Sequence, residues 1–178
     1  MRLRAATPDD AAAVAEIYAP FVTASAVSFE TEPPGAAAMR ERIESGRGVY
    51  PWLIGEARDG SILGYAYAGP FRTRPAYRFA VETSIYLRSD ACGRGLGMKL
   101  YEPLLAILVA QGFTQAIAAI SLPNEASVRL HERLGFERAG TYRQVGWKLG
   151  AWHDVGLWQR PLAEAAMPPA EPRPASLR

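Results

Sequence analysis

The chain carries the segment VETSIYLRSDACGRGLGM at residues 81–98. Its first half is an apolar run typical of an interior strand, and residues 95–111 are expected to form a long helix. Between them stand Gly93, Gly95 and Gly97, and glycine lets the backbone approach a ligand where a side chain would obstruct it. The free N–H groups of the first helical turn then converge on a ligand, ideally a diphosphate. The segment predicts a strand–loop–helix unit with a phosphate site.

A plainer interpretation is a tight strand-to-helix connection that uses glycine only for its turn, and the glycine spacing by itself leaves this open. Two familiar nucleotide loops can be set aside. No Lys-Ser/Thr pair follows the glycines, so a P-loop would lack its cation and its magnesium ligand. The spacing of the dinucleotide fingerprint is absent, and no N-terminal βαβ unit carries the loop.

Around this segment, periodicity and turn signals predict a single α/β domain. Thr7 is a candidate N-cap followed by Pro8, and Asp59-Gly60 is a hairpin signal. The expected order is βααβββαβαββ, a mixed, mostly antiparallel sheet flanked by helices. Strands are expected at residues 2–6, 50–57, 62–68, 80–87, 113–121, 136–145 and 152–159, and helices after Thr7 and at 36–47, 95–111 and 124–134. The domain is expected to cover residues 1–162, and the Pro- and Ala-rich residues 163–178 to form a disordered tail.

Composition excludes several classes of partner. The 178 residues, 49% of them hydrophobic, suit one globular domain with a real core. A net charge of +2 is too small to argue for nucleic acid, and no apolar run is long enough to span a membrane. Cys92 is the single cysteine, and residues 1–4 lack the apolar region of a secretory signal, so we expect a cytoplasmic protein. With His131 and His153 as the only histidines, no metal site is expected.

A second motif, NEASVRLHERLGF, spans residues 124–136. Asn124 is a candidate N-cap, and Gly135 is expected to end the helix in a left-handed conformation. With the glycine loop, this motif resembles the GNAT N-acetyltransferase superfamily. That family's loop runs Gln/Arg-x-x-Gly-x-Gly/Ala, and its helix runs Asn-x-x-Ser/Ala-x-x-Leu-Tyr-x-Lys-x-Gly-Phe. Cys92 departs from the loop pattern, since Gln or Arg is usual there, and this puts the tightness of CoA binding in question.

The resemblance implies an acetyl-CoA-dependent enzyme without a metal. It implies that the strand before the loop pairs its backbone with the pantetheine arm, in the manner of an added strand. It also implies that Asn124 contacts the pantetheine and that Arg133 lies near the CoA phosphates. The residues expected to contact acetyl-CoA are Ile85, Tyr86, Leu87, Gly93, Arg94, Gly95, Leu96, Gly97, Met98, Asn124 and Arg133.

Two residues are candidates for proton transfer. Glu82 lies in a strand of otherwise buried type, where a carboxylate is costly unless it is paired, hydrated or functional. Desolvation would raise its pKa into a useful range for a general base. His131 replaces the family tyrosine that protonates the departing thiolate, and histidine can do so near neutral pH. The alternatives are an ion pair of Glu82 with Arg78 or another loop arginine, and a purely structural hydrogen bond for His131.

Over residues 2–162 the chain also resembles a narrower family, the phosphinothricin and methionine sulfoximine acetyltransferases. The likeness includes the segment VGWKLGAWHD at residues 145–154. It implies a homodimer and an acceptor with an α-amino group, and an arginine suits a carboxylate in such an acceptor. The sequence departs from the family at Thr73-Arg74. The residues expected to meet the acceptor are Arg72, Thr73, Arg74, Glu82, Thr83 and Ser84.

Two other hypotheses remain open at this stage. The acceptor could be a protein N-terminus, a lysine or an aminoglycoside, which an acidic groove would favour. The chain could also be a CoA-binding module without turnover, against which the presence of both Glu82 and His131 argues.

Overall fold

The computed structural model of the chain describes residues 1–175. Its strands form one seven-stranded sheet in the order β1-β2-β3-β4-β5-β7-β6. β4 and β5 run parallel, and the other neighbouring pairs are antiparallel. The strands are β1 (Arg2–Ala5), β2 (Trp52–Glu56), β3 (Ile62–Pro70), β4 (Ala80–Leu87), β5 (Gln115–Leu122), β6 (Glu137–Lys148) and β7 (Ala151–Pro161). The α-helices are α1 (Ala11–Thr23), α2 (Ala36–Ser45), α3 (Leu96–Gln111) and α4 (Glu125–Arg133). The predicted element order and fold class are confirmed.

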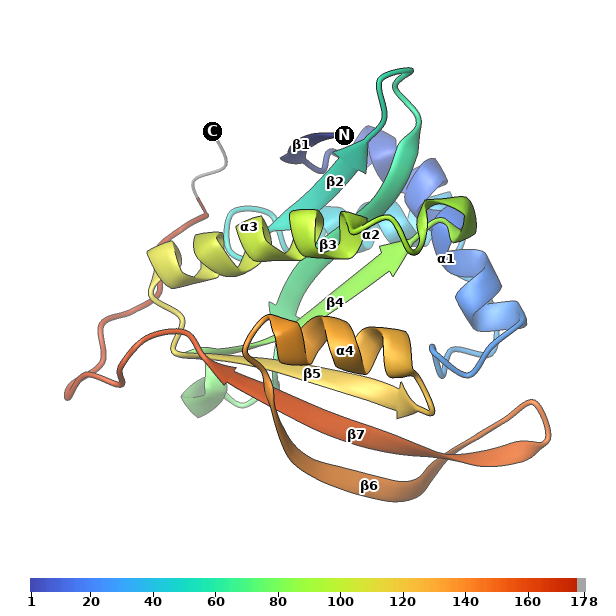
Figure 1. Ribbon diagram of the computed structural model, residues 1–178. Coiled ribbons are helices and arrows are strands. Elements are labelled where there is room, and N and C mark those ends of the chain that lie inside the picture. Colours follow the sequence, from blue (N-terminus) through green and yellow to red (C-terminus); the bar gives the residue numbers. More distant parts are fainter. Residues whose placement is uncertain (176–178) are drawn as a thin grey trace.

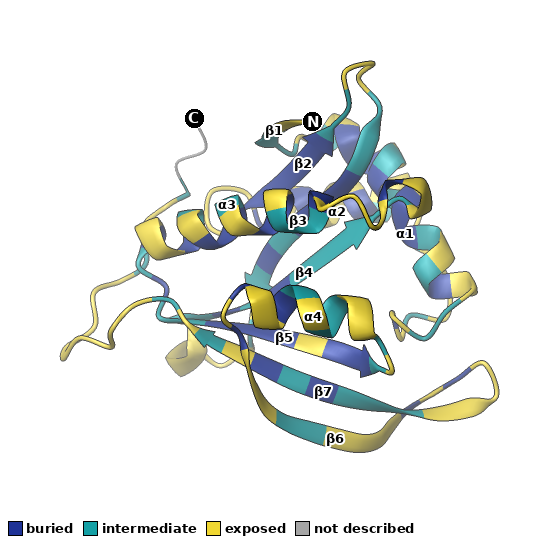
Figure 2. Cartoon of the chain, viewed as in Figure 1, coloured by how far each residue is buried: buried dark blue, intermediate teal, exposed yellow. Residues whose placement is uncertain are grey.

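The sheet separates two hydrophobic cores, because successive residues of a strand point to opposite faces. α3 and α4 cover one face (Figure 1), where Leu104 packs with Val81. α1 and α2 cover the other face, where Ile17 packs with Tyr65. Figure 2 shows β2 as mostly buried between these layers and β4 as mostly intermediate. In β4, the alternation directs Val81, Thr83 and Ile85 toward α3, and Glu82, Ser84 and Tyr86 toward α1.

The last two strands are longer than predicted. The expected loop over residues 146–150 shrinks to Leu149 and Gly150, which both have positive φ, at 51° and 74°. A two-residue turn of this kind matches the twist of an antiparallel hairpin. Trp147 pairs with Trp152 directly before it, with ring centroids 5.3 Å apart. This aromatic cross-strand pair extends the ladder beyond the predicted strand ends.

The chain after β7 contacts the domain without forming a helix or strand over residues 163–175. Glu171 accepts hydrogen bonds from the Arg78 guanidinium at 2.6–3.0 Å. The backbone N–H of Arg173 donates to the carbonyl of Gln111 at 2.7 Å. Residues 176–178 lie outside the described part of the chain. Disorder of this segment in solution stays a prediction.

Candidate active site

β4 and β5 diverge in the middle of the sheet. They pair at three positions, the last of which joins Glu82 to Ile117. β4 then continues beside β3 to Leu87, and β5 continues beside β7 to Leu122. The facing edges beyond the last pair are open to a ligand, and a pocket lies between them. Its lining consists of Val27, Thr83, Ser84, Ile85, Tyr86, Ala118, Ala119, Ile120, Ser121, Asn124, Ser127 and His131.

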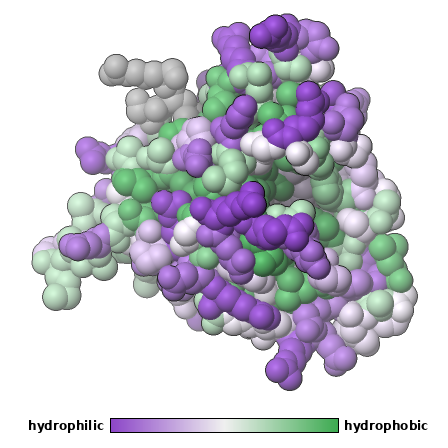
Figure 3. Space-filling view, viewed as in Figure 1, coloured by the Kyte–Doolittle hydropathy of each residue, from purple (hydrophilic) through white to green (hydrophobic). Residues whose placement is uncertain are grey.

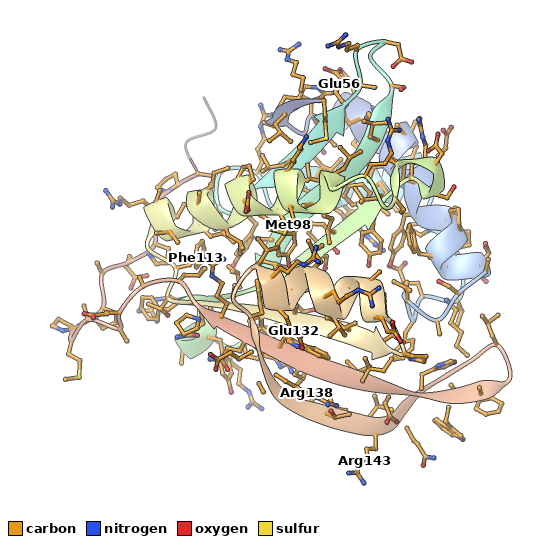
Figure 4. The ribbon with its side chains drawn as sticks, in the orientation of Figure 1. Glu56, Met98, Phe113, Glu132, Arg138 and Arg143 are labelled. Carbon is orange, nitrogen blue, oxygen red and sulfur yellow. The ribbon has the colours of Figure 1, made fainter. Side chains whose placement is uncertain are left out.

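The glycine loop lies at the end of β4 and begins α3. Gly93 and Gly95 have φ of +72° and +71°, a left-handed conformation that suits glycine. Gly95 is the N-cap residue of α3, so the first N–H groups of the helix have no partner within it. Gly97 serves packing, because a Cβ there would lie 3.2 Å from the Leu130 side chain of α4. Arg94 is exposed, Leu96 is buried, and Met98 lies between α3 and α4 (Figure 4).

α4 begins at the same end of the fork. The side chain of Asn124 caps the helix by accepting a hydrogen bond from the Ser127 backbone N–H at 3.1 Å, as the sequence predicted. Gly135 follows the helix with φ of +80°. Arg133 lies at the opposite end of α4, in a groove with Glu102 and Val109 of α3. The structure therefore does not bring Arg133 together with the glycine loop.

Glu82 lies at the point where the strands diverge. Its partner on β3 is Gly69, where even an added Cβ would meet nothing within 4 Å, so there is open space beside the carboxylate. Burial raises the pKa of Glu82, and the charge of Arg72 opposes that rise. The alternative of an ion pair with Arg78 is wrong, because the guanidinium of Arg78 is paired with Glu171.

The loop after β3 carries three further candidates for acceptor contact. Arg72, Thr73 and Arg74 are all exposed. The guanidinium of Arg72 lies 4.4 Å from the ring centroid of Phe71, a cation–π contact. The positive charge of Arg72 lowers the pKa of Glu82. Arg72 is therefore the arginine of this loop whose charge reaches the carboxylate at the fork.

Thr83 and His131 belong to the other face of the sheet. Thr83 is 3% exposed, and its hydroxyl donates to the carbonyl of Ile117 at 3.2 Å. His131 is also 3% exposed, and burial lowers its pKa. Its Nε2 lies 3.0 Å from the hydroxyl of Tyr101, and its Nδ1 lies 2.8 Å from the carbonyl of Ser127. The pocket between β4 and β5 is lined from both faces of β4, by Ser84 and Tyr86 on one side and by Thr83 and His131 on the other.

Comparison with known proteins decides the family. A model of the "Acetyltransferase (GNAT) domain" matches residues 3–157. The chain belongs to the GNAT acetyltransferase family. The predicted enzyme class, an acetyl-CoA-dependent N-acetyltransferase, is confirmed with it.

Relatives of this acetyltransferase match it over nearly their whole length. A phosphinothricin N-acetyltransferase of Streptomyces viridochromogenes is 43% identical over 99% of this chain and 95% of its own. An L-methionine sulfoximine/L-methionine sulfone acetyltransferase of Salmonella typhimurium is 34% identical over 96% and 99%. A phosphinothricin acetyltransferase of Sinorhizobium meliloti, solved in complex with AcCoA, superposes with a TM-score of 0.89 at 39% identity, over 96% of this chain and 93% of its own.

Several pocket residues of the acetyltransferase were not predicted. The fork is also lined by Val27, residues 118–121 and Ser127. The hydroxyl of Tyr101 forms a hydrogen bond with His131. A tyrosine on the buried, leucine-rich face of α3 was the available signal, because a buried phenol needs a hydrogen-bond partner. Among residues 1–175, no cluster of three potential metal ligands occurs, and no helix is long and apolar enough to cross a membrane.

Proposed function

We propose that this acetyltransferase moves an acetyl group from acetyl-CoA to the α-amino group of a small amino-acid-like acceptor, of the phosphinothricin, methionine sulfoximine or methionine sulfone type. The observation that carries the proposal is the position of Glu82, a half-buried carboxylate beside open space at the divergence of β4 and β5. The printed activities of the relatives support the choice of acceptor.

The cosubstrate is proposed to bind along the open edge of β4. Ile85, Tyr86 and Leu87 offer backbone groups that β5 does not take, as in strand addition. The pyrophosphate fits the glycine loop, whose free N–H groups and helix N-terminus favour an anion. The side chain of Asn124 lies at the same pocket. Together these groups hold the thioester beside Glu82.

The chemistry is direct transfer. Glu82 takes a proton from the acceptor ammonium, and the amine nitrogen then forms a bond to the acetyl carbonyl carbon. The carbon–sulfur bond breaks, the departing thiolate takes a proton from His131, and the bonded nitrogen loses its second proton to solvent, from which His131 is reprotonated. Ser84 lies on the Glu82 face of β4 and is proposed to contact the acceptor. Cys92 lies exposed in the loop, so it has no nucleophilic role in this scheme.

The first test is an acceptor screen that follows free CoA. We expect acetyl-CoA-dependent thiol release with phosphinothricin, methionine sulfoximine or methionine sulfone. Arg72→Gln should raise the acceptor KM about tenfold, because a charge-assisted bond to the acceptor carboxylate is lost. Arg78→Gln is the matched control, since Glu171 already holds that guanidinium. No thiol release with any of the three acceptors would sink the proposal.

The second test is the pH dependence of turnover. Glu82 must be ionised to act as a base, and burial raises its pKa. As the pH is lowered, the rate should therefore begin to fall at a higher pH than it would with an ordinary carboxylate. Arg72→Gln should move this acid limb to still higher pH, because Arg72 lowers the pKa. Glu82→Gln should reduce kcat by about 10²–10⁴-fold and leave acetyl-CoA affinity unchanged. Glu102→Gln is the control. If kcat is unchanged in Glu82→Gln, Glu82 is not the general base.

We also propose a homodimer formed through the end of the β6–β7 hairpin. Trp147, Leu149 and Trp152 are 60%, 62% and 57% exposed (Figure 2), and a cluster of exposed apolar side chains is typical of an interaction site. The other face of the hairpin is already covered, since the Lys148 ammonium donates to the carbonyl of Ser28 at 2.6 Å.

Sedimentation velocity tests the dimer. The chain should sediment as a dimer, and Trp147→Ser with Trp152→Ser should give a monomer, because the apolar contact is removed. Val109→Ser, at an exposed apolar position of α3, should leave the dimer intact. A wild-type monomer at micromolar concentration, or a double variant that still dimerises, would contradict this proposal.

A further inference from the structure

A chain of buried polar groups joins His131 to Thr83, and both of these residues line the pocket. The Nε2 of His131 lies 3.0 Å from the hydroxyl of Tyr101, which is fully buried. That hydroxyl lies 2.6 Å from the hydroxyl of Thr83, which in turn lies 3.2 Å from the carbonyl of Ile117. At the other edge of the ring, Nδ1 lies 2.8 Å from the carbonyl of Ser127. The network thus has four contacts and ends at a backbone carbonyl on each side.

The hydrogens available to this network depend on the charge of His131. A carbonyl only accepts, so Nδ1 carries a hydrogen that it donates to Ser127. With a neutral ring, the only other hydrogens are those of the two hydroxyls, which makes three for four contacts. One contact on the Nε2 side is then without a hydrogen, whether it is the contact of Nε2 with Tyr101, of Tyr101 with Thr83, or of Thr83 with the carbonyl of Ile117. A second ring proton supplies the fourth hydrogen, and Nε2 donates to Tyr101, Tyr101 to Thr83, and Thr83 to Ile117.

We propose that Tyr101, supported by Thr83, is a positioning residue that holds His131 ready to carry a second proton. The inference rests on the proposed function, in which His131 protonates the thiolate. When the ring loses a proton, the hydrogen of Tyr101 can turn from Thr83 to Nε2, and the Thr83 hydrogen can turn from Ile117 to Tyr101. Only the longest contact is then left without a hydrogen, and no heavy atom moves. The network accommodates both states of the ring but is complete only in the charged one.

Groups from several elements surround His131 and its network. Tyr101 faces it from α3, and Thr83 stands behind Tyr101 on β4. Ser127 faces it from α4, with its hydroxyl 3.3 Å from Nδ1, and the Phe136 ring lies 5.1 Å away. β5 contributes the carbonyl of Ile117.

The titratable groups near this network are few. Burial raises the pKa of Tyr101, so its phenol keeps its proton. Glu82, the carboxylate whose charge acts on Tyr101, points to the opposite face of β4. Burial lowers the pKa of His131, and its bond to Ser127 opposes that change.

The test is an NMR titration of the His131 ring, with His153→Asn as background so that one histidine signal remains. Tyr101→Phe removes the acceptor of the charged ring and should lower the pKa of His131 by about one unit, since hydrogen bonds to charged groups are about twice as strong as neutral ones. Thr83→Val leaves the phenol hydrogen without an acceptor in the charged state and should shift the pKa in the same direction. Thr83→Ser, which keeps the hydroxyl, should titrate like the parent.

Tyr50→Phe is the matched control, because Tyr50 packs on the same core cluster through Phe113. The proposal is overturned if His131 titrates at the same pH in Thr83→Val and the parent, or if Tyr50→Phe shifts it equally. Thr83→Val retains the side-chain shape and answers the question even if Tyr101→Phe does not fold. With an acceptor that the enzyme acetylates, the alkaline limb of the kcat–pH profile should move to lower pH by as much as the His131 pKa falls. The acceptor KM should stay constant. The titration needs no turnover, so a missing acceptor activity would refute the proposed function and not this inference.

Discussion

The divergence of β4 from β5 is the constraint on which the site depends. Backbone groups of an interior strand need partners, yet beyond Glu82 and Ile117 these two strands no longer supply them to each other. At this point the hydroxyl of Thr83 donates a hydrogen bond to the carbonyl of Ile117. The edges beyond it remain available, and α3 and α4 both begin at that end of the strands. Parallel strands make this possible, because both are followed by helices whose N-termini meet at the same edge.

The sheet also separates the two residues that we propose for proton transfer. Glu82 lies on the α1 face, where burial raises its pKa and Arg72 is the nearby cation. His131 lies on the α4 face, where its partners are uncharged. A carboxylate and a histidine in direct contact would stabilise each other's charged forms. Because β4 holds them apart, the pKa of each residue is set by its own surroundings. Figure 3 shows the α4 face, on which hydrophilic side chains surround the apolar surface between α3 and α4.

Local patterns predicted the parts of the site that depend on local physics. The left-handed Gly135 after α4 and the Asn124 cap at its start are set by residues next to them in the chain. Contacts between distant segments were not predictable in the same way. Tyr101 reaches Thr83 and His131 from 18 and 30 residues away, and Arg78 pairs with Glu171 across 93 residues. The alternative in which Arg78 pairs with Glu82 could not be excluded from the sequence for this reason. Arg138 and Arg143 lie along the outer strand β6 (Figure 4), outside the site.

We propose that the open edge of β4 and the glycine loop together bind the acyl-CoA. Hydrogen–deuterium exchange with and without acetyl-CoA tests it most directly, because each backbone amide that gains a partner exchanges more slowly. We expect protection at residues 84–87 and 93–98, with no change in the β2–β3 hairpin around Asp59 and Gly60. Protection confined to other segments, with residues 84–87 exchanging as fast as in the free protein, would contradict it.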